Sequence, residues 1–295
     1  MSAPVWLRYS LSVLSRIDPN RAAALAHAFF RKPSMTARCD EQDRRRLAEA
    51  GALMSALGRT RLTKIRGKRI KSYHFAGDGA GAVLLLHGWS GDSRAMGAFI
   101  EPLLDAGYEI TAIDFPAHGG SSGTETDAVE AAVATRRLLA GTQTKPDHII
   151  AHSFGGGVAG LLVDRGFAPR GFISIASPTR LSLIIDDLCA GLGLSAAARR
   201  RFEALIQKDL GRSIQACDAE LVWKCQETDI LAIHSPDDMR VPFAHAQHFA
   251  ALPNVTLKAL AWVDHCEIVY DPRTVHAALA HIQRVDEARR GPLAA

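Results

Sequence analysis

The feature that most constrains the fold of this chain is a regular alternation of short apolar runs with amphipathic segments. Each apolar run has the length of a buried strand, and the segments between them have the 3.6-residue period of helices. Several helical segments end at a glycine, as at Gly107, Gly141 and Gly166. This alternation predicts an α/β protein with a mostly parallel sheet and helices on both faces. The expected strands are near 82–86, 108–113, 147–152, 170–176, 229–234 and 255–260, and the expected helices near 93–105, 126–140, 154–165, 243–252 and 272–289.

A hairpin precedes this alternation and an insertion interrupts it. Residues 61–65 and 69–76 surround Arg66-Gly67-Lys68 and predict two antiparallel edge strands. Residues 177–228 separate two expected strands by about 50 residues and are expected to form a helical cap above the carboxyl edge of the sheet. The helical segments of this insertion are expected near 186–194 and 195–210.

The first 60 residues lie outside the alternation and have the pattern of three helices. Val5–Ile17 is amphipathic, and Asp18-Pro19 places an N-cap before a proline that can begin a second helix, which ends near Pro33. A third helix is expected from about Asp40 to Leu57, before Gly58. The expected division is a helical N-terminal extension at 1–60, an α/β core at 61–176 and 229–295, and a helical cap at 177–228.

The charge of the chain is unevenly distributed. Residues 1–71 have a net charge of +11 and the remainder −7, although the whole chain carries only +4. The basic extension has three potential partners: the acidic body, a second subunit in a homodimer formed through the N-terminal helices, or an anionic membrane surface with Trp6 and Tyr9 at the interface. No nucleic-acid-binding motif accompanies the basic residues, so we expect no nucleic-acid partner.

The composition indicates a globular protein of a reducing compartment. Of the 295 residues, 47% are hydrophobic and 22% charged, which excludes disorder and a disulfide scaffold. The longest apolar runs, such as Ala82–Leu86, are far shorter than the ~20 residues of a membrane-spanning helix. The five cysteines, including Cys39, are widely spaced without a Cys-x-x-Cys pair, and no secretory signal is evident. We therefore expect a cytoplasmic protein.

The expected strand at 147–152 leads directly into Ser153-Phe154-Gly155 and a helix. This is the context of the Gly-x-Ser-x-Gly nucleophile elbow, with Ala151 in place of the first glycine. The strained turn requires small residues two positions either side of the serine, and Ala151 and Gly155 meet that requirement. Ser153 is thus the expected nucleophile, with its Oγ at the edge of the sheet.

Another strand ends in His87-Gly88-Trp89, where a second oxyanion-hole donor is expected. The backbone N–H groups of Trp89 and Phe154 would together point at the oxygen that becomes negative in a tetrahedral intermediate. We assign no catalytic role to the Trp89 side chain. His87 is interpreted as an orienting or packing residue rather than a base.

A serine nucleophile needs a base, and the base needs an acid that orients it. His265 follows one of the last expected strands and is the candidate base, whereas the segment after the strand at 229–234 offers Asp237 and Asp238 as acids. Adjacent residues in an extended loop point in opposite directions, so only one of them can face His265. We expect Asp237 to cap nearby backbone N–H groups. Asp264 would have to fold back on its own neighbour. The remaining histidines, among them His245, His248, His276 and His281, lack metal-site spacing, so we expect no metal.

From about Arg61 to the C-terminus, these motifs together resemble the α/β-hydrolase fold family, in its serine esterase or lipase-like branch. The resemblance implies an eight-stranded, mostly parallel sheet, a cap that matches 177–228, and an acid four residues before Pro242, which is Asp238. A serine nucleophile argues against the dehalogenases and epoxide hydrolases of this fold, which use aspartate. The matching segments are 87–89, 114–121, 151–155, 238–242 and His265.

The expected function is cofactor-independent hydrolysis of a carboxylic ester or thioester through an acyl-enzyme. Ser153, His265 and Asp238 form the expected triad, and Trp89 and Phe154 the oxyanion hole. The same triad is compatible with carbon–carbon bond hydrolysis or a perhydrolase activity, and the fold is also compatible with a noncatalytic binding protein. We expect a small-molecule ester or acyl substrate, but periodicity identifies no substrate-binding residue.

Overall fold

The computed structural model describes residues 4–34, 41–142 and 144–290. It contains an eight-stranded sheet with strand order β1-β2-β4-β3-β5-β6-β7-β8. Only β2 runs against the other strands, so six strands form a continuous parallel set. The predicted fold class is confirmed. The strands are β1 (Arg59–Ile65), β2 (Lys68–Phe75), β3 (Gly81–Leu86), β4 (Tyr108–Ile113), β5 (His148–His152), β6 (Gly171–Ile175), β7 (Asp229–His234) and β8 (Val255–Ala259).

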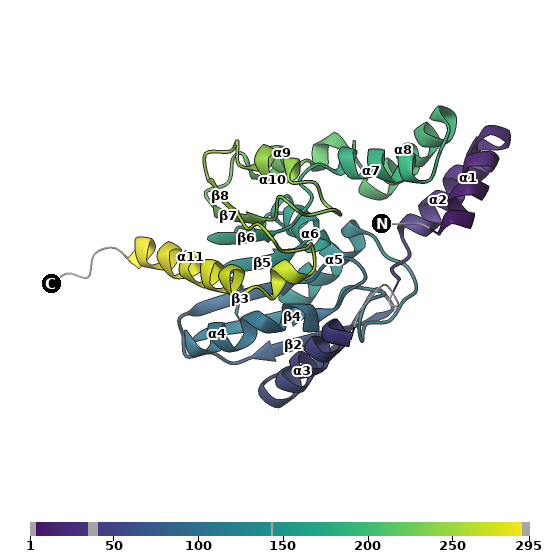
Figure 1. The fold of residues 1–295 in the computed structure, drawn as a ribbon. Coiled ribbons are helices and arrows are strands. Elements are labelled where there is room, and N and C mark those ends of the chain that lie inside the picture. The colour runs from purple at the N-terminus through teal and green to yellow at the C-terminus, as the bar shows by residue number, and fades with distance from the viewer. Residues whose placement is uncertain (1–3, 35–40, 143, 291–295) are drawn as a thin grey trace.

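Helices cover both faces of this sheet, as Figure 1 shows. They are α1 (Val5–Ile17), α2 (Pro19–Phe30), α3 (Glu41–Leu57), α4 (Ile100–Asp105), α5 (Ala128–Leu139), α6 (Phe154–Val163), α7 (Leu181–Gly191), α8 (Ala196–Leu210), α9 (Ala219–Trp223), α10 (Ala244–Phe249) and α11 (Pro272–Arg290), with short 3₁₀ segments η1 (Ser93–Phe99), η2 (Gln215–Cys217) and η3 (Glu267–Val269). Helices α3, α4 and α11 pack in the core cluster of one face, and α5, α6, α9 and α10 in that of the other. None of the described helices is long and apolar enough to cross a membrane.

The central strands are apolar along their whole length because both of their faces are covered. In β3, Val83 and Leu85 point into the cluster with α3, α4 and α11, whereas Leu84 and Leu86 point into the cluster with α5 and α6. All four side chains are buried. This explains why the sequence shows continuous apolar runs instead of the alternating pattern of a strand with one face in water.

A third cluster lies apart from the sheet. It joins α1 and α2 to α7 and α8, with Leu11, Ala22, Ile185 and Phe202 among its buried members. Figure 1 shows these four helices together at one side of the molecule, whereas α3 lies against the sheet. The N-terminal helices therefore divide between two different packing partners.

The structure differs from the sequence prediction in three places. Helix α7 begins at Leu181 rather than near residue 186, and the expected helix at 93–105 is a 3₁₀ segment followed by α4. Trp223 in α9 stacks on Phe172 of β6, with ring centroids 4.5 Å apart, so the end of the insertion belongs to the core packing. The predicted helix start at Asp40 and Cys39 lie outside the described residues.

Candidate active site

Ser153 occupies a sharp turn between β5 and α6. Its backbone has φ 50° and ψ −117°, a conformation that side-chain-bearing residues rarely adopt. A Cβ atom on Gly155 would lie only 2.6 Å from the carbonyl oxygen of Leu86, so the turn needs glycine at that position. The close approach of α6 to β3 and the strain at Ser153 are both features of an elbow that lifts a side chain off the sheet edge.

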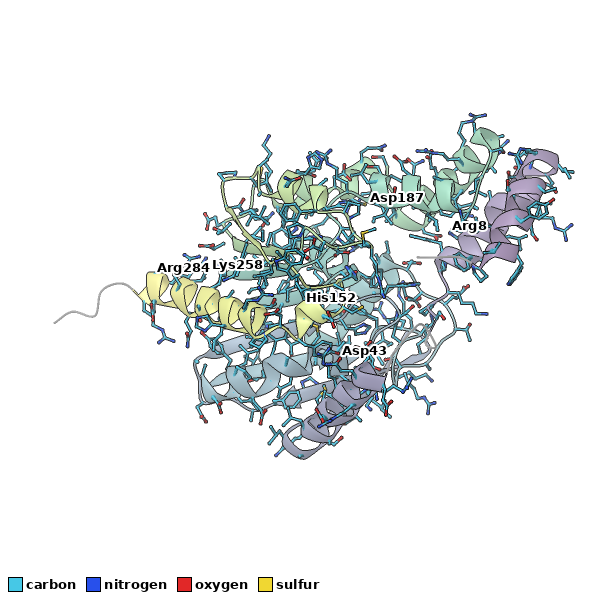
Figure 2. All side chains as sticks on the ribbon, in the orientation of Figure 1. Arg8, Asp43, His152, Asp187, Lys258 and Arg284 are labelled. Atoms are coloured by element: carbon cyan, nitrogen blue, oxygen red, sulfur yellow. The ribbon has the colours of Figure 1, made fainter. Side chains whose placement is uncertain are left out.

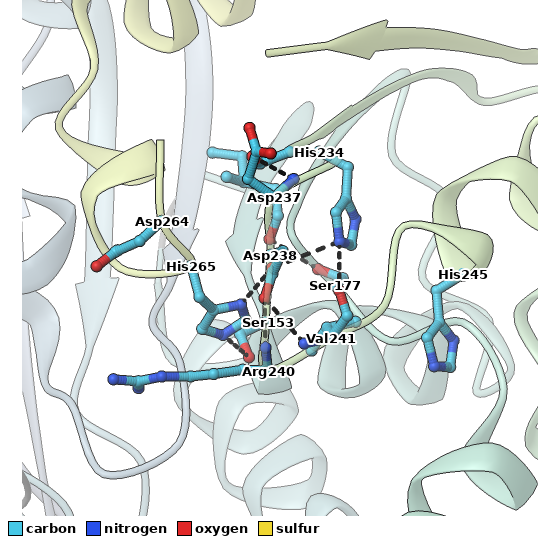
Figure 3. A network of polar contacts seen from close by, with 12 residues as sticks. Ser153, Ser177, His234, Asp237, Asp238, Arg240, Val241, His245, Asp264 and His265 are labelled. Carbon is cyan, nitrogen blue, oxygen red and sulfur yellow. Dashed lines mark hydrogen bonds and ion pairs between the residues drawn. The ribbon is translucent and has the colours of Figure 1, made fainter. Parts of the chain in front are cut away.

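His265 lies within hydrogen-bonding distance of both Ser153 and Asp238, as Figure 3 shows. His265 Nε2 is 2.9 Å from Ser153 Oγ, and His265 Nδ1 is 2.7 Å from Asp238 Oδ2. Because an ionised carboxylate only accepts hydrogen bonds, Nδ1 must carry the proton. Nε2 is then left with a lone pair directed at the serine hydroxyl.

The Asp238 carboxylate is completely buried and surrounded by donors. Its Oδ1 accepts the backbone N–H groups of Arg240 and Val241 at 2.8 and 2.9 Å. His234 Nε2 donates to the carbonyl oxygen of Val241 at 2.9 Å and lies 3.4 Å from Asp238 Oδ2. Burial raises the pKa of Asp238, but hydrogen bonds from His234 and His265 outweigh burial and hold this pKa well below its ordinary value. Asp238 is therefore ionised and fixed in orientation.

The carboxylates of the two rival acids are hydrogen-bonded to backbone N–H groups other than that of His265. Asp264 Oδ1 accepts the backbone N–H groups of Cys266 and Glu267, both at 2.7 Å, at the start of η3. Asp237 Oδ2 accepts the backbone N–H of Trp262 at 2.8 Å. The expectation that Asp237 caps its own neighbourhood was therefore wrong for this carboxylate: it connects the loop after β7 to the loop before His265.

His152 is a site residue that the sequence analysis missed. Its Nε2 is 2.9 Å from the carbonyl oxygen of His265, and the two rings are 5.0 Å apart. Burial, together with any positive charge on His265, lowers the pKa of His152 to about 3. A neutral His152 with its proton on Nε2 can donate to that carbonyl, so it connects the backbone of His265 to the residue before Ser153. Figure 2 shows His152 in the interior of the molecule.

The turn after β3 is held by two buried histidines. His87 Nε2 accepts the backbone N–H of Phe115 at 3.1 Å, and His118 Nε2 accepts that of Ser90 at 3.1 Å. Trp89 packs edge-on against Phe154, with centroids 5.0 Å apart, so the two expected oxyanion donors belong to neighbouring residues. The N–H of Phe154, the first residue of α6, is one of the helix N–H groups that have no acceptor within the helix. His87 thus contacts the backbone as an orienting residue does.

Asp114 supports the same turn from the end of β4. Its Oδ1 accepts the backbone N–H of Ser93 at 2.9 Å, and its Oδ2 accepts that of Gly120 at 2.8 Å. A Cβ on Gly119 would collide with the Asp114 carboxylate at 2.4 Å. This buried carboxylate therefore connects the loops after β3 and β4.

Comparison with known proteins adds the family to this geometry. The model of the alpha/beta hydrolase family matches residues 83–285, more than two thirds of the chain. The chain belongs to the alpha/beta hydrolase family. The predicted family resemblance is confirmed, and this α/β hydrolase has the helical N-terminal region in addition to the family's sheet.

Two curated relatives are similar to parts of this α/β hydrolase. The dihydrolipoyllysine-residue acetyltransferase component of the acetoin cleaving system from Cupriavidus necator is 27% identical over 241 residues, which cover 68% of the chain and 63% of the relative. A serine hydrolase-like protein from Danio rerio is 40% identical over 83 residues, 27% of the chain and 25% of that protein. The α/β hydrolase thus spans less than two thirds of the length of either relative.

Solved structures share the fold at low sequence identity. An esterase from Exiguobacterium antarcticum superposes with a TM-score of 0.59 at 15% identity and covers 77% of this chain and all of the esterase. A carboxylesterase structure from Nitrososphaera gargenis gives a TM-score of 0.57 at 15% identity, over 77% and 98% of the two chains. These similarities place the sheet and its helices among hydrolases of the same fold.

Proposed function

We propose that this α/β hydrolase cleaves a carboxylic ester or thioester through an acyl-enzyme on Ser153. The observation that carries the proposal is the continuous hydrogen-bond chain from Ser153 Oγ through both ring nitrogens of His265 to the buried Asp238 carboxylate, with distances of 2.9 and 2.7 Å. A serine aligned in this way with a histidine and an oriented acid is the arrangement of an activated nucleophile.

In the acylation step, Ser153 Oγ attacks the carbonyl carbon while His265 Nε2 takes its proton. The imidazolium that forms is stabilised by the ionised Asp238, whose lowered pKa keeps it from taking the proton itself. The carbonyl oxygen becomes an oxyanion, and the backbone N–H groups of Trp89 and Phe154 are the proposed donors to it. Each such donor contributes roughly 10²–10³ in rate.

His265 then returns the proton to the leaving alcohol or thiol as the tetrahedral intermediate collapses. The acyl group remains on Ser153 Oγ until a water molecule, deprotonated by His265, attacks the ester. The carboxylic acid leaves and Oγ recovers its proton. Since side chains, backbone donors and water supply every step, we propose a reaction without a cofactor or metal.

The proposal also includes the domain division, the location of the protein and its partners. We propose that residues 177–228 form the cap over a small-molecule ester or acyl substrate, between the core segments 61–176 and 229–295, with 1–60 as the extension. The four described cysteines, Cys189, Cys217, Cys225 and Cys266, are free, which supports the proposed cytoplasmic location in a reducing compartment. The basic residues have no nucleic-acid-binding motif beside them, so no nucleic-acid partner is proposed.

A series of p-nitrophenyl esters of increasing acyl length, with a matched thioester, tests the proposal. We expect hydrolysis of at least the short esters, and Ser153→Ala should lower turnover by roughly 10⁶, the loss known for a triad serine. Wild-type activity in the variant would contradict the nucleophile assignment. Absence of turnover on every ester, with a folded protein, would favour carbon–carbon or perhydrolase chemistry or a noncatalytic binding role.

A further inference from the structure

Helix α1 presents an apolar face to solvent. Val5, Trp6, Tyr9, Val13 and Ile17 are between 40% and 80% exposed, and we call these five residues the outer face of α1. At 100° per residue they lie within about one third of the helix circumference. They account for five of the eleven large apolar side chains that are exposed among the described residues. An apolar group this concentrated, on a single helix, is typical of an interaction site.

The outer face is fixed in this orientation because the opposite face of α1 is already docked. Leu11 is buried in the cluster with α7 and α8. Ser195 Oγ donates to the carbonyl oxygen of Ser15 at 2.6 Å, and Arg8 Nε donates to that of Gly191 at 2.7 Å. Figure 2 shows Arg8 where the N-terminal helices lie beside α7 and α8. Rotating α1 to cover its outer face would therefore expose the inner one.

The segment that carries the outer face is mostly basic. Residues 4–34 contain five basic residues and a single acidic one, Asp18. Asp18 caps α2 by accepting the backbone N–H of Arg21, and Arg31 is paired with Asp127 and Asp209. Within the described part of the chain, no carboxylate lies within ion-pair distance of the other arginines of α1 and α2, namely Arg8, Arg16 and Arg21.

We propose that the outer face of α1 docks on an anionic lipid surface. Tryptophan and tyrosine place an apolar ring and a polar group at the same depth, which suits the boundary between headgroups and acyl chains. Arg16, which lies on the same side of α1 as the outer face, would meet anionic headgroups, and such a charge near the surface strengthens binding several-fold. This surface differs from the Ser153 site and requires no catalysis there.

Charge also distinguishes lipid from a second copy of the chain. A two-fold interface places the same face of both subunits in contact. The arginines of one α1 would then lie near those of the other, and Asp18 is the only carboxylate that these segments could contribute. Anionic headgroups supply the missing negative charge, whereas an identical helix does not.

Co-sedimentation of the full chain with vesicles tests this proposal. One set of vesicles contains phosphatidylcholine with phosphatidylglycerol and the other phosphatidylcholine alone, each at low and high salt. We expect binding to the mixed vesicles that salt weakens. The double variant Trp6→Ser/Tyr9→Ser should lower the binding constant by about tenfold or more. The matched control is Leu62→Ser/Leu221→Ser, which removes two exposed apolar side chains elsewhere and should bind like the parent chain.

Three outcomes would overturn the proposal. The first is no binding of the parent chain to mixed vesicles at low salt, or equal binding to both kinds of vesicle. The second is unchanged binding by the Trp6/Tyr9 variant, with circular dichroism as the check that it is folded. The third is a dimer in sedimentation equilibrium that this variant converts to a monomer, which would assign the face to a second copy. Ser153→Ala should bind vesicles like the parent, so failure here is distinguishable from failure of the proposed hydrolysis.

Discussion

The carboxyl edge of the sheet and the hairpin formed by α1 and α2 are stabilised in contrasting ways. At the sheet edge, buried polar groups hold one another: Asp238 is completely buried and is ringed by donors, and Ser153 keeps a strained backbone. The hairpin is held by a separate apolar cluster with α7 and α8 and leaves one face of α1 uncovered. The first region fixes the orientation of a few polar side chains, and the second leaves an apolar surface exposed.

The hairpin is nevertheless connected, through Arg31, to α8 and to the beginning of α5. Its guanidinium lies 3.0 Å from Asp209 of α8 and 3.3 Å from Asp127, the N-cap of α5. Its carbonyl oxygen accepts the backbone N–H of Thr126 at 2.9 Å. Partly exposed ion pairs of this kind contribute little individually, so we attribute most of the attachment to the apolar cluster.

The largest effect of a single substitution is expected at Asp238, in the sheet-edge region. Asp238→Asn removes the charge that stabilises the imidazolium and disturbs the tautomer of His265, so turnover should fall by about 10⁴. Asp237→Asn is the matched control, because its carboxylate accepts the Trp262 N–H in the loop before His265, and this change should cost a few-fold at most. Steady-state rates on one activated ester measure both. Equal effects, or a larger effect at Asp237, would contradict the assignment of the acid.

Acid should unfold the protein through the histidines near the sheet edge. Burial is the main reason that folding lowers the pKa of His118 to about 4, of His152 to about 3 and of His245 to about 4. Unfolded histidine has a pKa near 6.5, so between about pH 6.5 and pH 4 the unfolded chain binds more protons. The free energy of unfolding is therefore highest above this pH window and decreases as the pH falls through it, by up to about 1.4 kcal/mol per pH unit for each histidine.

Thermal unfolding at a series of pH values between about 7.5 and 4.5 measures this effect, because that range covers most of the pH window in which these histidines destabilise the fold. His118→Gln should make the dependence shallower, because it removes one of the buried histidines whose pKa folding lowers. A melting temperature that does not change across the window would contradict the neutral, buried state of these rings.

The third effect is expected in the apolar cluster that joins α1 and α2 to α7 and α8, and it should be confined to that part of the molecule. Phe202 of α8 is fully buried and packs edge-on against Phe30 of α2, with centroids 5.9 Å apart. Phe202→Ala should cost about 3–5 kcal/mol within that cluster. Because the cluster shares no buried residue with either sheet cluster, we expect α1, α2, α7 and α8 to melt before the sheet. Leu25→Ala, at a half-exposed position of α2, is the control. One cooperative transition for Phe202→Ala would show that the two regions unfold together.

The sequence predicts the features that depend on neighbouring residues. Apolar runs identify the central strands because both of their faces are buried, and the small residues around Ser153 identify the turn because no larger side chain fits at Gly155. The divergence of adjacent side chains indicates only that one of Asp237 and Asp238 can face His265, and the choice of Asp238 depends on the family resemblance, which implies an acid four residues before Pro242. In each case the constraint acts within a few positions of the residue it identifies.

Features that depend on distant contacts were not predictable in this way. His152 contacts the backbone of His265, 113 residues away, and His234 interacts with Asp238 only through the fold of the loop after β7. Histidine at the end of an apolar strand was the available signal for both, but it does not specify a partner. Similarly, α1 is apolar on two sides, so periodicity alone cannot identify the side that packs on α7 and α8.

Covalent labelling of Ser153 tests the central claim most directly. A fluorophosphonate reacts with a serine whose proton can pass to a histidine, and mass spectrometry of the digested protein locates the adduct. We expect one adduct, on the peptide that contains Ser153, with labelling lost in Ser153→Ala and strongly slowed in Asp238→Asn. A folded protein that remains unlabelled, or that is labelled at another residue, would contradict the proposed nucleophile and with it the acyl-enzyme mechanism.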